Sequence, residues 1–460
     1  MRENIPTILW TWALLSPLLF RLIPGRDAAI ACLLVGWAIL PIGDYPASCF
    51  AADLGLGNGG SAHALAVPAW PIASKAPAIG LGCLAGLLLF DRRAWERIRF
   101  GRADLPMAAW CLVPIASAVA NGGPLSAGLA QSRYLLLAWG VPYAMGRAYL
   151  DDPGSRRRFL LGLVAAGLAY LPACLLENAA GPMLYGRAFG PHPYQVEGAV
   201  RALGHRPLVL LEHGNQLGIW MANSAIAATW LWATGAVRRP WGIPGGPLAG
   251  ALVAATLLCQ SHASILYLAV ALLPLLAGRV PIRAGGWRLA AAMTLTIGAL
   301  TATLLAARRG FDLGALREDL RHLFRAIRKV SFTWRLARSA DYLPVALERP
   351  ILGSGRPDWG PGGRPFLNPV NLGIWLLSLG MYGLVGLAAS ATAWIAPAAR
   401  AIVRPRSRPA GGPDGALVAL LIVNFLDGLS NSVLILPLLA AAGGLLQPAE
   451  ASAEGARPNH

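Results

Sequence analysis

Charged residues are scarce in this sequence. They occupy 13% of the 460 positions, whereas hydrophobic residues occupy 56%. A soluble domain is about 25% charged, so a water-soluble enzyme of this length would carry roughly twice as much charge on its surface. This composition also excludes a disordered chain and a disulfide scaffold. The apolar residues instead form long runs, separated by short segments rich in Arg, Pro and Gly. We therefore expect a polytopic membrane protein.

Lysine is nearly absent as well. Lys75 and Lys329 are the two lysines, every other basic residue is arginine, and the formal net charge is +17. A GC-rich genome is one explanation of this bias. The other is that the planar guanidinium group suits phosphate and pyrophosphate oxygens. Nucleic acid is not an expected partner, because the basic residues alternate with apolar runs instead of gathering on a soluble domain.

Metal-ligand clusters are missing from the sequence. The six cysteines are scattered, and neither a CxxC pair nor a His/Cys cluster occurs, so we expect neither zinc nor a disulfide framework. No metal and no other cofactor is expected.

The apolar runs predict an all-α bundle. A bilayer span needs about 20 mainly apolar residues, and about 12 runs are candidates. They lie near 5–23, 27–43, 76–90, 105–120, 126–147, 158–176, 207–234, 246–260, 262–278, 287–306, 371–396 and 415–446. The last run alternatively forms a broken pair around Asp427-Gly428, and the Gly/Ala/Pro-rich stretch 44–75 alternatively holds a re-entrant segment. We interpret 1–446 as one integral membrane domain, whose first helix is retained, and 447–460 as a disordered cytoplasmic tail.

Arginine-rich short connections predict the topology. They occur at 92–102, 156–158, 238–239, 279–283 and 400–408, and such connections are typical of the cytoplasmic side. The alternating segments 121–125, 177–206, 260–262 and 307–370 are then extracytoplasmic. Two of these, 177–206 and 307–370, are much longer than the usual 2–8 residues, and functional residues concentrate on long loops held by a rigid scaffold.

The larger loop contains an amphipathic pattern over 313–330. Seven apolar side chains from Leu313 to Val330 share one helical stripe, and four arginines at 317, 321, 325 and 328 occupy the next. A helix of this kind lies in the membrane interface. Its arginines either bind anionic lipid or form a positive rim for a lipid-linked pyrophosphate.

Two motif groups accompany this pattern, one after it and one well before it in the sequence. Arg335 precedes the turn Pro350-Ile-Leu-Gly353-Ser-Gly355, and a span then opens at Asn371 and contains Gly380-Met-Tyr-Gly383. The upstream loop contains Arg201, Gly204, Arg206-Pro207 and His213-Gly214. Over roughly residues 105–395 this arrangement resembles the O-antigen ligase and O-antigen polymerase superfamily of bacterial envelope proteins.

The resemblance implies a fold of the membrane glycosyltransferase (GT-C-like) type in the bacterial inner membrane. It also implies transfer of a glycan from undecaprenyl pyrophosphate to a sugar acceptor, by ligation or polymerisation, in O-antigen or exopolysaccharide biosynthesis. The expected partners are the lipid-linked donor, the acceptor and membrane lipids. By this resemblance the catalytic residues are Arg335, His213 and Arg206, and the substrate-binding residues are Arg201, His192, Arg338 and Asn371. Arginines in place of a metal would stabilise the departing pyrophosphate.

One departure from the family pattern concerns the general base. Many ligases carry His-Asn just ahead of the span that here starts near Asn371, whereas this chain has Pro369-Val370 there. The base then comes from His213, His205 or Glu212, or the acceptor needs little deprotonation.

Structural interpretations compete with these assignments. His213-Gly214 alternatively caps a helix, the loop arginines alternatively bind lipid headgroups, and Asp427 and Asn431 are expected to form hydrogen bonds between helices. For the whole chain, the alternatives are a transporter or flippase for a polar or lipid-linked substrate, and a non-catalytic partner of a polysaccharide export machine.

Overall fold

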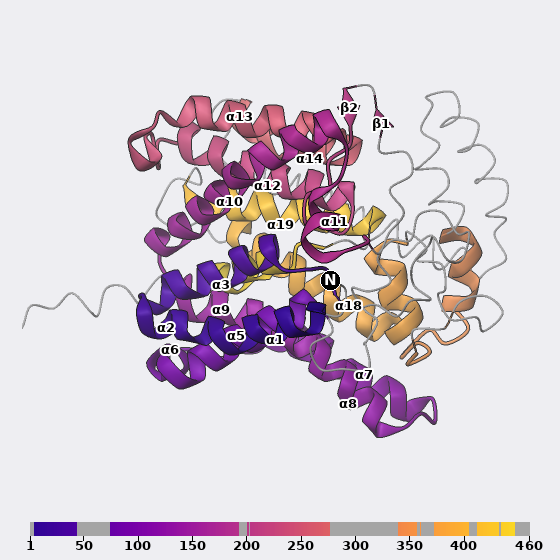
Figure 1. Ribbon diagram of the computed structural model, residues 1–460. Coiled ribbons are helices and arrows are strands. Elements are labelled where there is room, and N and C mark those ends of the chain that lie inside the picture. Colours follow the sequence, from indigo (N-terminus) through magenta and orange to yellow (C-terminus); the bar gives the residue numbers. More distant parts are fainter. Residues whose placement is uncertain are drawn as a thin grey trace, which may run out of the picture.

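The computed structural model describes residues 4–43, 74–192, 200–201, 203–276, 339–356, 359, 372–403, 412–431 and 434–446. Helices make up most of this part of the chain, as expected for an all-α membrane protein (Figure 1). Its one ladder pairs β1 (Val200–Arg201) with β2 (Gly204–His205) in antiparallel register. This small hairpin was not expected from the sequence, and Gly204, with φ +100°, closes it.

The N-terminal half places helices at each of the expected runs. They are α1 (Ile5–Leu15), η2 (Ser16–Leu18), α2 (Leu19–Leu22), α3 (Gly25–Ile39), α5 (Lys75–Phe90), α6 (Arg92–Glu96), η5 (Arg102–Asp104), α7 (Leu105–Ala120), α8 (Leu125–Leu135), η6 (Leu136–Gly140), α9 (Val141–Tyr149), α10 (Pro153–Ala180) and α11 (Leu184–Phe189). The run 126–147 is one continuous helical segment, in which the π-helical turn η6 joins α8 to α9.

The C-terminal half continues the same pattern. Its elements are α12 (Gly214–Ala233), η7 (Pro240–Gly242), α13 (Gly245–Leu258), α14 (His262–Leu276), α18 (Ile374–Val403), α19 (Pro413–Ser430), η9 (Leu436–Leu438) and α20 (Leu439–Leu445). The run 415–446 is a broken pair, divided between Ser430 and Leu436 a little beyond Asp427-Gly428. The runs or segments at 44–73, 287–306, 313–330 and 447–460 lie outside the described residues.

Five of the described helical segments are long and apolar enough to cross a membrane. They are Ile5–Leu22, Arg102–Ala120, Pro153–Ala180, Ile374–Val403 and Pro413–Ser430. Shorter apolar helices, among them α5 and α13, accompany them. The expectation of an α-helical membrane protein is confirmed at this level, whereas the number of about 12 spans stays a prediction.

The core forms around α12, which is buried along nearly its whole length. A helix that is apolar on all sides is typical of such a central position. Asn223 of α12 and Asn424 of α19 exchange side-chain hydrogen bonds of 3.2 and 2.9 Å inside this core. A second contact unites α7, η6 and α18, where Trp110 packs edge-on against Trp139 and Tyr382.

Ion pairs gather at one end of the bundle. Arg156, which is buried, bonds Asp414 at 2.9 Å and the Gly444 carbonyl at 2.9 Å. Nearby, Arg147 pairs with Asp104 at 3.2 Å, and Arg26 pairs with Asp152 at 3.0 Å. These contacts join the start of α10, the end of α9 and the starts of α3 and α19. We call this the arginine-rich end.

We call the opposite end of the bundle the loop end, because the segments that connect the helices at that end include the long loop 181–213. Ile42, just after α3, accepts a hydrogen bond from the Lys75 amide at 3.3 Å and donates one to the Tyr185 hydroxyl at 3.4 Å. Gln260, after α13, donates to the Gly204 carbonyl at 3.4 Å. In Figure 1, α2 and α6 lie at the left of the bundle, whereas β1 and β2 lie at the right.

A sharp break divides α18 near the loop end. Gly383 has φ +65° and ψ −162°, which is not helical, so the backbone groups around it need other partners. The turn 350–355 provides them: the Ser354 and Gly355 amides donate to the Gly380 and Met381 carbonyls, each at 2.9 Å. In return, the amides of Leu384 and Val385 donate to the carbonyls of Pro350 and Ile351 at 2.7 and 3.2 Å.

The glycines of both motifs have a steric reason in this contact. A Cβ at Gly353 would overlap the backbone of Met381 and Tyr382, and one at Gly383 would overlap the Ile351 carbonyl. From α7, Ser117 donates to the Met381 carbonyl at 3.1 Å and to the Leu352 carbonyl. The Pro/Gly turn therefore packs against the break in α18 and supplies hydrogen-bond partners to its backbone. Such partners are needed because water is absent from the bilayer core.

Candidate functional site

The start of α12 is the centre of the polar residues at the loop end. The sequence predicted a span from 207, but 206–213 are not helical and α12 begins at Gly214. Pro207 has no amide hydrogen to donate, and His213 ends the extended segment as the N-cap residue. The Asn215 amide donates to His213 Nδ1 at 3.1 Å. The expected capping role of His213 is therefore present in the structure.

This cap determines the tautomer of His213. A ring nitrogen that accepts a hydrogen bond carries no hydrogen, so a neutral His213 has its hydrogen on Nε2. His213 in this state can donate a hydrogen bond from Nε2, but it cannot accept a proton there. It is consequently a poor candidate for the general base.

Arg206 lies across the first turn of α12. Its guanidinium donates to Asn215 Oδ1, and its side chain covers Gly214 so closely that a Cβ there would overlap the Arg206 Nε atom. Glycine after His213 is therefore the residue that lets the arginine approach the helix. Arg206 and His213, two of the predicted catalytic residues, are brought together through Asn215.

The network extends to two other helix ends. Asn215 accepts a hydrogen bond from the Ser261 hydroxyl at 3.3 Å and donates one to Asn431 Oδ1 at 3.5 Å. Asn431, the residue after α19, in turn donates to Asp427 of that helix at 2.6 Å. The expected hydrogen bond between helices is present for Asn431, which meets Asn215 of α12, whereas Asp427 bonds Asn431 of its own segment. The Ile374 amide, at the start of α18, donates to the Asn431 carbonyl at 3.3 Å.

Glu177 anchors the loop between α10 and α12. Its carboxylate is fully buried and accepts four backbone hydrogen bonds, from the amides of Met183 and Leu184 at 2.9 and 2.8 Å and of Leu208 and Val209 at 2.8 and 2.7 Å. Four donors on one carboxylate compensate its burial. Glu177 thus ties the segments on both sides of the β1–β2 hairpin to the end of α10.

Of the predicted substrate-binding residues, two are described. His192 Nε2 lies 3.2 Å from the Leu211 carbonyl, and its ring packs edge-on against Tyr185 with centroids 4.7 Å apart. Arg201 is exposed on β1. Arg335, Arg338 and Asn371 lie outside the described residues.

Lys75 was not predicted as a site residue. It begins α5 with 1% of its surface exposed, and its Nζ lies 4.4 Å from the centroid of the Trp37 ring. Glu212, one residue before the His213 cap, donates its amide to Gln216 Oε1 at 3.0 Å. The rarity of lysine in this arginine-rich sequence was the one available signal, because the sequence does not show that Trp37 of α3 covers the Lys75 side chain.

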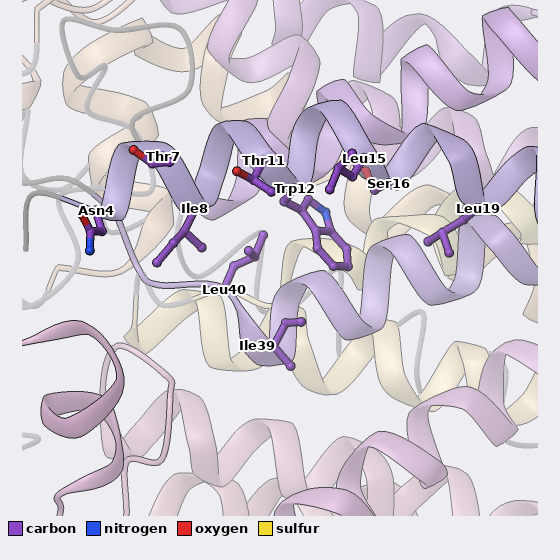
Figure 2. A pocket seen from close by; sticks show the side chains of 10 residues that line it. All are labelled: Asn4, Thr7, Ile8, Thr11, Trp12, Leu15, Ser16, Leu19, Ile39 and Leu40. Carbon is purple, nitrogen blue, oxygen red and sulfur yellow. The ribbon is translucent and has the colours of Figure 1, made fainter. Parts of the chain in front are cut away.

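A separate groove lies along α1, with a volume of about 660 Å³. Figure 2 shows Asn4, Thr7, Thr11 and Ser16 along one side of that helix, with Ile39 and Leu40 of the α3 end across from them. Its lining has no titratable side chain and is mostly apolar, as for a surface facing lipid chains. No residue of the Arg206–Asn215 network lines it, and it is not the candidate site.

The described residues contain no group of three or more His, Cys, Asp or Glu side chains that could hold a metal ion. What the site offers is a guanidinium, an imidazole donor and several amides at the ends of four helices. Such groups suit an anionic ligand rich in oxygen.

Comparison with family models, with curated proteins and with solved structures finds no match to this chain.

Proposed function

We propose that this protein is a membrane glycosyltransferase of the O-antigen ligase and polymerase type. It transfers a glycan from undecaprenyl pyrophosphate to a sugar hydroxyl at the outer face of the bacterial inner membrane, which it crosses several times. The observation that supports this most is the meeting of Arg206 and His213 on the start of α12, at the end of the bundle opposite the arginine-rich end. In this proposal the fold is of the GT-C-like type.

The chemistry needs fixed positive groups. No ATP or nucleotide sugar is available at the outer face, so the energy comes from the pyrophosphate leaving group. Arg206, oriented by Asn215, and Arg335 of the large loop bind the oxygens of that group as its negative charge develops. Preorganised donors of this kind commonly supply the largest part of catalysis. Arg201, Arg338, His192 and Asn371 are proposed to contact the donor and acceptor around them.

A clean deletion followed by electrophoresis of lipopolysaccharide and extracellular polysaccharide tests this function. Loss of the lipid A–core ladder with accumulation of undecaprenyl-linked polymer indicates a ligase. A product with a single repeat indicates a polymerase. Unchanged glycans together with altered solute uptake would contradict the proposal and indicate transport.

Variants of the two arginines test the proposed site directly. Arg206→Ala and Arg335→Ala are each expected to lower glycan transfer by about 10²–10³, the usual effect of removing one preorganised donor. The lysine variants should recover little, because an ammonium group cannot make the two-pronged contact. Arg187→Ala is the matched control, since Arg187 is exposed on α11 in the same loop.

Arg321→Ala, on the expected interfacial stripe, should cost only lipid affinity, about 1 kcal/mol for a basic residue near an anionic surface. Equal activity of Arg206→Ala, Arg335→Ala and the two controls at equal expression would show that both arginines are anchors.

A transporter remains the second candidate because α18 is interrupted, a feature that many secondary transporters share. In transporters, unwound backbone near the bilayer midplane faces a substrate cavity. Here the non-helical backbone around Gly383 is instead hydrogen-bonded to the turn 350–355. This contact favours the transferase over the transporter.

A further inference from the structure

A chain of hydrogen bonds leads from Arg206 into the bundle. The Arg206 guanidinium donates to Asn215 Oδ1, and the side-chain amide of Asn215 donates to Asn431 Oδ1 at 3.5 Å. Asn431 donates from Nδ2 to the Asp427 carboxylate at 2.6 Å. Two asparagines thus connect an arginine of the loop end to an acidic residue of α19. We call these four residues the Arg206–Asp427 relay.

The hydrogen bonds of the relay all run in one direction. A guanidinium group only donates hydrogen bonds, so Asn215 must present its oxygen to Arg206. The nitrogen of Asn215 then faces Asn431, which must present its own oxygen. An ionised carboxylate only accepts, so Asp427 completes the relay by accepting from the Asn431 nitrogen. The orientation of each amide therefore depends on the next residue of the relay.

Burial makes a reversed amide costly in this relay. Asn431 and Asp427 are each only 3% exposed. If the Asn431 side chain turned around, its oxygen would face the Asp427 carboxylate and its nitrogen would face the Asn215 nitrogen. Two acceptors or two donors in contact are left unsatisfied where water is excluded, and each pays its desolvation cost. Asp427 therefore holds Asn431 in the orientation that accepts from Asn215.

Asn431 is itself fixed at the junction of α18 and α19. Its backbone amide donates to the Asp427 carbonyl at 2.8 Å, and its carbonyl accepts from the Ile374 amide at 3.3 Å. Its Nδ2 also donates to Ser430 Oγ at 3.2 Å. Arg206 lies on the non-helical segment before α12. Contact with this fixed junction, through Asn215, therefore adds order to an arginine that no helix positions directly.

We propose that Asn431 is a positioning residue of this transfer, which holds Arg206 in place through Asn215 and is itself oriented by Asp427. This inference rests on the proposed function. A pyrophosphate gains negative charge as it leaves, and an arginine stabilises that charge only from the correct position. Displacement of such a group by about 1 Å can lower the rate about 10²-fold. Asn431 does not touch the substrate in this proposal and acts through Arg206.

Transfer kinetics of the purified protein in nanodiscs, with a polyprenyl-pyrophosphate-linked saccharide, test this role. Asn431→Leu is expected to lower kcat by about 10–10², with a smaller change in KM, because Arg206 acts mainly on the leaving group in the transition state. Asn424→Leu is the matched control, since Asn424 of α19 also bonds an asparagine of α12, Asn223, inside the core. Equal kcat of the two variants would overturn the proposal, because loss of a buried amide contact between the same helices would then explain the effect.

An exchange of the side chains at 427 and 431 tests the direction of the relay. In Asn431→Asp the new carboxylate faces Asp427, so two acceptors meet and kcat should fall as in Asn431→Leu. The double variant Asn431→Asp/Asp427→Asn places a donor opposite that carboxylate and keeps an acceptor for Asn215. It leaves the net charge unchanged and should restore kcat to the level of Asp427→Asn alone. A double variant no more active than Asn431→Asp would contradict the relay.

Unfolding temperatures in detergent separate this inference from the proposed function. Asn431→Asp should lower the unfolding temperature, and the added Asp427→Asn should regain most of the loss. If this holds while wild-type protein transfers no glycan, the proposed function fails and the relay is supported. If wild-type protein transfers glycan but Asn431→Leu keeps the kcat of Asn424→Leu, the positioning role fails and the proposed function is supported. Additive temperature shifts of the two substitutions would contradict the relay itself.

Discussion

At the scale of single residues, the buried carboxylate of Glu177 has the clearest structural role. It joins the end of α10 to both segments that flank the β1–β2 hairpin, through four amide donors. From the sequence, Glu177 is one of several polar residues at the edge of an apolar run. Its role depends on residues 31 and 32 positions away, and local pattern contains no information on such contacts.

Replacement of this carboxylate should destabilise the loop. In Glu177→Gln the amide nitrogen cannot accept, so two of the four backbone donors are left unsatisfied. Each buried unsatisfied donor costs about 1–3 kcal/mol, which predicts a loss of about 2–6 kcal/mol. Thermal unfolding in detergent measures the loss, with Glu96→Gln as the exposed control. A variant as stable as that control would show that water replaces the lost acceptor.

The metal dependence of glycan transfer also depends on individual residues. The described residues offer no cluster of metal ligands, and the arginines are proposed to neutralise the pyrophosphate. Glycan transfer in nanodiscs should therefore persist in EDTA. Loss of activity on chelation, with recovery on addition of magnesium or manganese, would show that a cation and not an arginine holds the leaving group.

At the scale of elements, the turn 350–355 and the broken helix α18 form one unit. The sequence shows the two glycine motifs 27 positions apart, as separate parts of the pattern that carries the resemblance. In the structure each motif supplies hydrogen-bond partners to the other. Ser117 of α7 and Asn121, the residue after this helix, complete the contact, since Asn121 donates to the Gly353 carbonyl at 2.9 Å. Spacing along the chain could not reveal this pairing.

A glycine substitution tests that contact. Gly353→Ala combines a positive φ of +65° with overlap against Met381 and Tyr382, so the turn should leave the break in α18. Gly122→Ala has nearly the same φ, +69°, but open space around the added Cβ. It therefore isolates the backbone cost of about 1–2 kcal/mol.

Limited proteolysis and thermal unfolding compare the two variants. Gly353→Ala should be cut faster within 349–356 and should unfold at a lower temperature than Gly122→Ala. Equal behaviour would mean that the docked turn adds little to the stability of the break.

At the scale of the whole molecule, the bundle has two chemically different ends. One end contains the ion pairs of Arg26, Arg147 and Arg156. The other contains Lys75, Glu177, Glu212 and the Arg206–Asn215 network. Arginine-rich ends face the cytoplasm in most membrane proteins, so the loop end is expected to be extracytoplasmic.

Reporter fusions test this orientation. Fusions after Gly190 and after Gly355 should be active as alkaline phosphatase and inactive as green fluorescent protein. A fusion after Arg239, between α12 and α13 at the opposite end, should behave in the reverse way. The opposite outcome at any of the three positions would contradict the predicted topology.

The sequence by itself determined the class of this protein and the positions of its helices. Runs of apolar residues with few charges favour helices in a bilayer, because the backbone must satisfy its own hydrogen bonds there. The boundaries depended on local chemistry, and a start of α12 at Gly214 instead of 207 follows from Pro207 and the His213 cap. Apolarity alone does not mark such a start.

Only the tertiary structure decided which polar residues meet. Arg206 and His213 were recognised from their motif, but Asn215, Ser261 and Glu177 join the site through contacts between separate segments. The physical reason is that a buried charge or amide needs a partner of complementary chemistry at short range. Any of several polar residues can satisfy that need, and the packing of the helices selects the one that does.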